Sequence, residues 1–129
     1  MISCQVFDEV LYISPMSKIV LANDQSIAEA ADLIKRGELV VLPTETVYGL
    51  GANALDGLAV AKIFEAKKRP QFNPLIVHVM DVAKASELVE MDARAKKVAD
   101  AFWPGPLTLI LPRRENSGIS ELVSAGLDT

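Results

Sequence analysis

The chain has 129 residues, the length of one domain, and its 13 Lys and Arg against 17 Asp and Glu give a formal net charge of −4. This acidic balance argues against a dedicated non-specific nucleic-acid binder, although a local basic patch is compatible with it. A 50% hydrophobic content excludes a disordered chain, and the single cysteine, Cys4, excludes an internal disulfide. One His and one Cys are too few for a zinc site. The sequence contains no apolar run long enough to predict a membrane span. We therefore expect no protein-bound metal, no membrane contact and a cytoplasmic location.

The sequence divides into two parts after residue 18. Residues 1–18 are interpreted as an N-terminal appendage and residues 19–129 as the domain. Apolar residues recur at i, i+3, i+4 and i+7 from Ser26 onwards, Glu29 completes a capping box with Ser26, and Gly37 marks the end. This pattern predicts the first helix.

The segment after this helix predicts a buried strand followed by a loop and a second helix. Residues 39–42 are a short, continuous apolar run, as in a strand buried on both faces, and residues 43–51 follow as a loop. Asp56 is placed to cap a helix that Pro70 ends.

The second half of the chain repeats the alternation of strands and helices. Residues 75–79 predict a strand, Asp81 and Asp92 each open a helix, and residues 107–111 predict another strand. The order of helix, strand, helix, strand, two helices and strand predicts an α/β architecture.

Two polar segments follow predicted elements at positions where α/β proteins bind ligands. Residues 44–49 combine hydroxyls, a carboxylate and a phenol beside glycine, although an ordinary turn rich in local hydrogen bonds explains the same composition. Residues 67–69 are three consecutive cations, which the helix dipole alone would favour. Pro70 and Pro74 nevertheless fix the backbone beside them, and a rigid group of Lys, Arg and Asn suits a polyanion such as a nucleoside triphosphate.

Several single residues are ambiguous by themselves. His78, the only histidine, shares a strand face with Ile76, and a hydrogen-bonded structural role is the usual one for such a residue. Trp103 is most simply a core anchor, Thr108 a strand residue, and residues 113–114 a basic surface turn.

Four segments gain meaning when they are read together in their order and spacing. They are PTETVYGLG at residues 43–51, KKRP at 67–70, NPLIVH at 73–78 and WPGPLT at 103–108. Together they resemble the signature motifs of the YrdC-like family of threonylcarbamoyl-AMP synthases, and the similarity extends over residues 19–129. The resemblance implies an α/β fold with an open, twisted, mixed sheet, flanking helices and a concave basic cleft.

The resemblance also implies a reaction. Family members make L-threonylcarbamoyladenylate and pyrophosphate from L-threonine, bicarbonate or CO2, and ATP, with Mg²⁺ accompanying the ATP. The product serves the formation of N6-threonylcarbamoyladenosine at position 37 of tRNA, which implies tRNA-modification proteins as partners and tRNA or double-stranded RNA as a further ligand. A nucleotidyltransferase of this kind needs no protein nucleophile, so we expect no covalent intermediate.

Carried over residue by residue, the resemblance assigns roles to six positions. Those toward L-threonine are Thr46 and His78, and those toward ATP are Lys67, Arg69, Asn73 and Thr108. Lys67 and Arg69 match the K-x-R motif of the family and are the expected catalytic residues, with Lys68 standing where the family often has Gly.

One motif of the family is absent from this sequence. The Ser-x-Asn motif of the family would lie beyond residue 127, so the resemblance implies a domain whose C-terminal part is not in this sequence.

Two alternative functions are considered. The first is a double-stranded RNA or tRNA-binding module without catalysis, and the net charge of −4 argues against it. A carbamoyl-transfer protein is the second, although such proteins usually carry zinc-finger cysteines, which this chain lacks.

Overall fold

A computed structural model describes residues 2–5, 18–68 and 73–129 of the chain. Its sheet has four strands, which are β1 (Ile2–Gln5), β2 (Val40–Pro43), β3 (Tyr48–Ala52) and β4 (Ile76–Val77). The helices are α1 (Asp24–Lys35), α2 (Gly57–Lys67), α3 (Val82–Leu88), α4 (Ala93–Phe102) and α5 (Glu121–Ser124). The expected α/β class is thereby confirmed.

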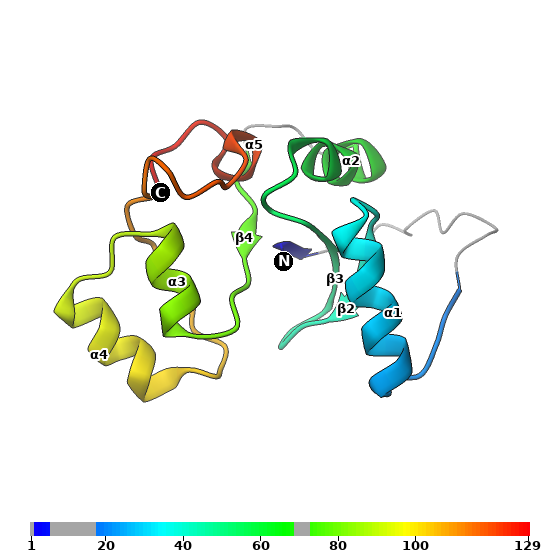
Figure 1. The fold of residues 1–129 in the computed structure, drawn as a ribbon, viewed down its shortest axis with the longest axis horizontal. Coiled ribbons are helices and arrows are strands. Elements are labelled where there is room, and N and C mark those ends of the chain that lie inside the picture. Colours follow the sequence, from blue (N-terminus) through cyan, green and yellow to red (C-terminus); the bar gives the residue numbers. More distant parts are fainter. Residues whose placement is uncertain (1, 6–17, 69–72) are drawn as a thin grey trace.

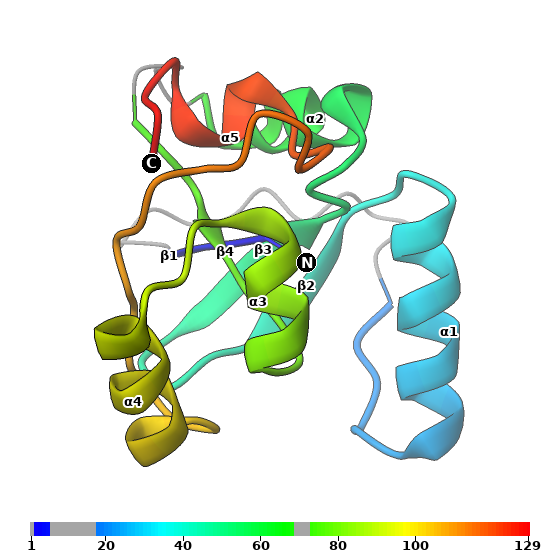
Figure 2. The same cartoon turned by 60° about the vertical axis from the view of Figure 1, so that its left-hand side comes forward.

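The helices surround the sheet on several sides. Figure 1 shows α1 beside β2 and β3, and α3 with α4 on the opposite side of the molecule. The turned view in Figure 2 shows α2 and α5 lying together across one end of the sheet. The strand order is β2-β3-β1-β4, and every pairing between these strands is antiparallel, whereas a mixed sheet was expected.

Aspartate side chains begin three helices where the sequence predicts them. The carboxylate of Asp56 accepts hydrogen bonds from the N–H groups of Leu58 and Ala59, and Asp81 and Asp92 each accept one at the starts of α3 and α4. These bonds satisfy amides that have no partner within the helix.

The first helix begins earlier than predicted because a different residue caps it. Asn23 is the N-cap, its side chain accepts from Ser26 N at 3.0 Å, and the hydroxyl of Ser26 accepts from Asn23 N at 2.9 Å. The capping box therefore joins Asn23 to Ser26, and the expected pairing of Ser26 with Glu29 is wrong. Gly37 follows the helix with a φ of +77°, as its role as a stop requires.

The expected buried strand is an edge strand of a hairpin. β2 pairs on one side with β3, and Val41 is 50% exposed, so burial on both faces is wrong. The segment at 43–51 is only partly a loop, because its second half is β3, with Leu42 opposite Gly49 and Pro43 opposite Tyr48. Antiparallel pairing with a short turn explains how both strands fit in so few residues.

The later strands are shorter than predicted. Only Ile76–Val77 of residues 75–79 is a strand, and residues 107–111 form none in the described structure. An apolar run becomes a strand only where a neighbouring strand supplies partners for its backbone groups, and beside residues 107–111 the described chain provides none. The nearest pairing is an isolated bridge between Val89 and Arg113.

Part of the segment interpreted as an appendage lies in the sheet. β1 pairs with β3 on one side, where Cys4 is opposite Leu50, and with β4 on the other, where Ile2 is opposite Val77. The sequence pattern did not predict this strand. The boundary between residues 18 and 19 stays a prediction.

The hydrophobic core lies between α2, β3 and α5. Val60 and Ile63 on α2 are completely buried, and Leu50, Leu75 and Val123 join them from other elements. The N–H of Leu75 donates to the carbonyl of Val123 at 2.8 Å, which ties the entry of β4 to α5. None of the described helices has the length and apolar character needed to cross a membrane.

Candidate active site

The tip of the β2–β3 hairpin is organised by the hydroxyl of Thr44. Its Oγ1 accepts hydrogen bonds from the N–H groups of Thr46 at 3.3 Å and Val47 at 3.2 Å, and it donates to the carbonyl of Val47. Thr44 N also donates to Val47 O at 3.0 Å. Glu45 and Thr46 are consequently presented at an exposed turn with a defined backbone.

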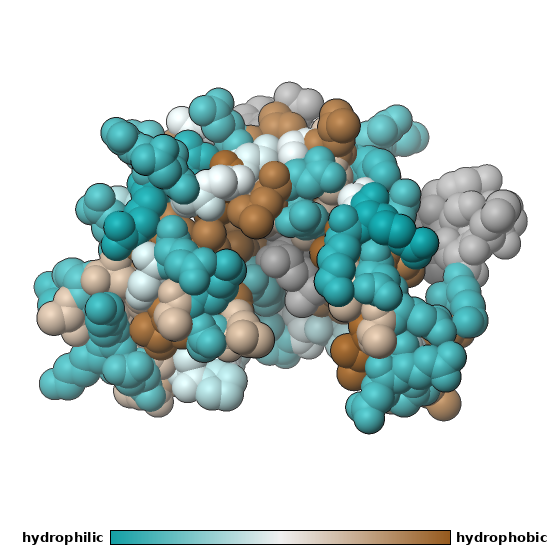
Figure 3. Space-filling view, viewed as in Figure 1, coloured by the Kyte–Doolittle hydropathy of each residue, from teal (hydrophilic) through white to brown (hydrophobic). Residues whose placement is uncertain are grey.

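A cavity of about 630 Å³ lies next to this turn. Its walls are mostly apolar and come from residues 74–80, from Ala85, Leu88 and Val89, and from residues 107–111 and the C-terminal residues. Figure 3 shows hydrophobic side chains gathered at the middle of this face, between the part with α3 and α4 and the part with α1. An open apolar cavity with a few polar groups is the usual form of a small-molecule site.

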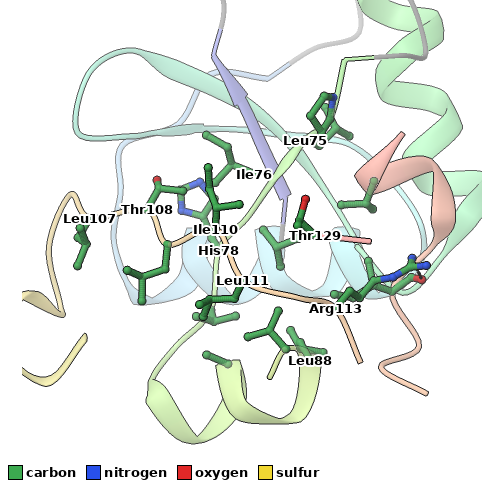
Figure 4. A pocket seen from close by; sticks show the side chains of 18 of the residues that line it. Leu75, Ile76, His78, Leu88, Leu107, Thr108, Ile110, Leu111, Arg113 and Thr129 are labelled. Carbon is green, nitrogen blue, oxygen red and sulfur yellow. Dashed lines mark hydrogen bonds between the residues drawn. The ribbon is translucent and has the colours of Figure 1, made fainter. Parts of the chain in front are cut away.

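Charged and polar side chains from several parts of the chain line this cavity. They include Glu45, His78, Thr108 and Arg113, together with the hydroxyl residues Ser124 and Thr129. Figure 4 shows His78, Thr108 and Arg113 with the leucine and isoleucine side chains of β4 and residues 107–111. The cavity thus joins segments that are far apart in sequence, and Arg113 is the only Lys or Arg among its described lining residues.

His78 is the titratable group most affected by this environment. Burial lowers the pKa of its imidazole below the ordinary value of 6.5, and the negative charge of Glu45 opposes that shift in part. At neutral pH the imidazole is therefore mainly neutral. A neutral imidazole offers one N–H donor and one nitrogen acceptor, which suits the binding of a polar small molecule.

Lys67 lies at the other end of α2 from Asp56. It is the last residue of the helix, where the dipole favours a cation, and burial lowers the pKa of its amine below 10.5. Lys68 follows as the C-cap with a left-handed φ of 47°. Arg69, its partner in the K-x-R motif, lies outside the described residues.

The structure brings some of the predicted site residues together and leaves others apart. His78 and Thr108 line the same cavity, and Thr46 is adjacent to Glu45 at its edge. Asn73 is half-buried just before β4, and neither it nor Lys67 is among the described lining residues. The described lining of this cavity therefore does not form the concave basic cleft that the resemblance implies.

Two residues that line the cavity were not predicted to be part of the site. Arg113 was interpreted as part of a surface turn but is half-buried, and its Nη1 lies 3.5 Å from the carbonyl of Ile119. Trp103 was interpreted as a core anchor but lines the cavity, with its Nε1 donating to Leu107 O at 2.8 Å. Only a prediction that the segments 103–108 and 113–119 fold around β4 would have found them.

The described part of the chain contains no group of three or more His, Cys, Asp or Glu side chains placed to hold a metal ion.

Comparisons with known proteins agree with this structure. A family model named for Sua5, YciO and YrdC and described as "Telomere recombination" matches residues 32–129. The threonylcarbamoyl-AMP synthases of Bacillus subtilis and Pyrococcus abyssi are each 52% identical to the chain over 108 residues, which is 83% of this chain and 31% of each relative. The chain thus spans less than a third of the length of these relatives.

A solved structure gives the same result for the fold. The crystal structure of P. abyssi Sua5 complexed with L-threonine superposes with a TM-score of 0.78 at 48% sequence identity, covering 84% of this chain and 32% of that one. Sequence and structure therefore agree that the chain belongs to the YrdC-like family, the family of Sua5, YciO and YrdC.

Proposed function

We propose that the protein is an L-threonylcarbamoyladenylate synthase, a nucleotidyltransferase that uses L-threonine, bicarbonate or CO2, and ATP and releases pyrophosphate. The observation that carries the proposal is the 52% identity over 108 residues to two proteins named threonylcarbamoyl-AMP synthase. The double-stranded RNA or tRNA-binding module without catalysis is not favoured, because these relatives are named as enzymes.

L-Threonine is the substrate that we assign to the cavity beside the β2–β3 turn. Thr46 and His78 would contact its polar groups, and the apolar walls of the cavity suit its methyl group. Two observations support this assignment: the neutral state favoured by burial of His78, and the crystallisation of the P. abyssi relative with L-threonine. Thr108 lines the same cavity and would contact ATP where the two substrates meet.

Lys67 and Arg69 are the proposed catalytic residues, with Asn73 and Thr108 as further ATP contacts. In the reaction, an oxygen of threonine carbamate forms a bond to the α-phosphorus of ATP while the bond from that phosphorus to pyrophosphate breaks. Negative charge accumulates on the leaving pyrophosphate, and fixed cations stabilise it. The placement of Lys67 at the end of α2 provides such a cation on a rigid element.

Mg²⁺ is proposed to arrive with the triphosphate. The described residues contain no carboxylate cluster that would hold it alone, and Mg²⁺ in nucleotide sites commonly relies on phosphate oxygens and water. When bound, it would neutralise phosphate charge. The product would pass to tRNA-modification partner proteins for position 37 of tRNA, in the cytoplasm.

Substitution of the two catalytic cations tests this proposal. We expect Lys67→Ala and Arg69→Ala each to slow threonine-dependent pyrophosphate release by about 100-fold, because each removes a cation that stabilises the leaving group. Lys68→Ala is the matched control, since it removes an adjacent cation outside the K-x-R pattern and is expected to retain activity. Full activity of the double variant would refute the roles of Lys67 and Arg69. Absence of threonylcarbamoyl-AMP with the parent protein would refute the function itself.

A further inference from the structure

We propose that Thr44 is a positioning residue for L-threonine, which acts by holding the hairpin tip that carries Glu45 and Thr46 against the cavity. The inference rests on the proposed function, because it assigns a role in binding that substrate. Thr44 itself does not line the cavity among the described residues, so its action is through its neighbours.

The hydroxyl of Thr44 is fully used by the turn. A threonine hydroxyl has one donor and two acceptor lone pairs. Here it donates to Val47 O and accepts from Thr46 N at 3.3 Å and Val47 N at 3.2 Å. Its oxygen also lies 3.5 Å from Oγ1 of Thr46. One side chain thus fixes the backbone of Thr46, the residue proposed to contact the substrate.

The hairpin itself does not depend on this hydroxyl. Thr44 N donates to Val47 O at 3.0 Å, and the strands on either side stay paired from Pro43 opposite Tyr48 to Val40 opposite Gly51. Residues 45–48 are exposed, so water can replace the lost partners of the turn amides. Removal of the hydroxyl is therefore expected to disorder the tip without unfolding the sheet.

The chemical consequence concerns one substrate only. Glu45 lines the cavity and Thr46 is next to it at the hairpin tip, whereas the proposed ATP contacts come from outside the hairpin. Lys67 is on α2, Asn73 precedes β4, and Thr108 is in the segment 107–111. Small displacements of a positioning group reduce the population of correctly placed substrate complexes. The KM for L-threonine should therefore rise while the KM for ATP changes little.

The test compares Thr44→Val, which keeps the shape but removes the hydroxyl, with Thr44→Ser, which keeps the hydroxyl. We expect Thr44→Val to raise the KM for L-threonine by about tenfold with a similar KM for ATP, and Thr44→Ser to restore it. Ser26→Ala is the matched control, because the Ser26 hydroxyl also bonds backbone groups but belongs to α1, which contributes no described residue to the cavity. Thermal unfolding of each variant is measured alongside.

Each other outcome overturns the inference. An unchanged KM for L-threonine in Thr44→Val, or failure of Thr44→Ser to restore it, shows that the hydroxyl does not position the substrate. An equal rise in both KM values together with a lower melting temperature shows a purely structural role. If Thr44→Val does not fold, Thr44→Ala is measured against the same criteria. A parent protein that forms no threonine-dependent product refutes the proposed function first, and the inference with it.

Discussion

Truncation of Ile63 tests whether α2 is packed as the structure shows. Ile63 is completely buried in the core cluster that joins α2 to β3 and α5. Ile63→Ala removes three carbon atoms, and at about 0.8 kcal/mol for each buried methylene the lost transfer free energy is about 2.4 kcal/mol. A residual cavity adds to this cost, so we expect the free energy of unfolding to fall by about 3 to 4 kcal/mol.

Two further variants are compared with Ile63→Ala for their effect on the free energy of unfolding. Ile63→Val removes one methylene and should cost about 1 kcal/mol. Leu58→Ala lies on the same helix, but Leu58 is 81% exposed, so its truncation should change stability by no more than about 0.5 kcal/mol. The three variants therefore separate burial from a general effect of substitutions in α2.

Urea unfolding followed by far-ultraviolet circular dichroism measures these differences. The transition midpoint reports stability if the slope of free energy against urea concentration stays constant across the variants. Equal losses for Ile63→Ala and Leu58→Ala would refute the packing of α2 on β3 and α5. A changed slope in one variant would instead indicate that its folded or unfolded state has a different compactness.

Two further predictions use the same protein. Asp56→Ala removes the carboxylate that accepts from Leu58 N at 2.9 Å and Ala59 N at 3.3 Å, so urea unfolding should show a free energy of unfolding lower by about 1 kcal/mol. Asp56→Asn keeps a capping oxygen and should largely avoid this loss. Equal losses in both variants would show that capping is not the cause. Because His78 is the only histidine, proton NMR should show one imidazole titrating below pH 6.5. The stability that the buried, neutral imidazole of His78 contributes is complete above the unfolded pKa of 6.5 and is lost as the pH falls toward the lower folded pKa. His78→Gln should therefore make the free energy of unfolding less sensitive to acid. A pKa at or above 6.5 in the folded protein would contradict the burial of His78.

Helix starts were predictable because capping is a local interaction. The carboxylates of Asp56, Asp81 and Asp92 bond to amides two or three residues along the chain, so the sequence contains both partners within one turn. The first helix shows the limit of such reasoning. Asn23 and Ser26 are both good caps, and only the observed bonds show that Asn23 begins the helix and Ser26 closes the box.

Strands were less predictable because their partners lie far away in the chain. β1 pairs with β3 across more than 40 residues, and nothing within residues 2–5 indicates that pairing. Residues 107–111 have the apolar composition of a strand but no described strand beside them. For the same reason the resemblance identified His78 and Thr108, but not that one cavity would contain them with Arg113.

The position of His78 depends on the core more than on the sheet. β4 has only two residues, and its pairing with β1 involves Ile76 and Val77 alone. The residue before β4, Leu75, is buried in the core cluster, and its N–H donates to Val123 O at 2.8 Å. His78 therefore emerges into the cavity from a segment fixed at Leu75 by the same packing that buries Ile63, so the stability of that core and the geometry of the proposed L-threonine site are linked.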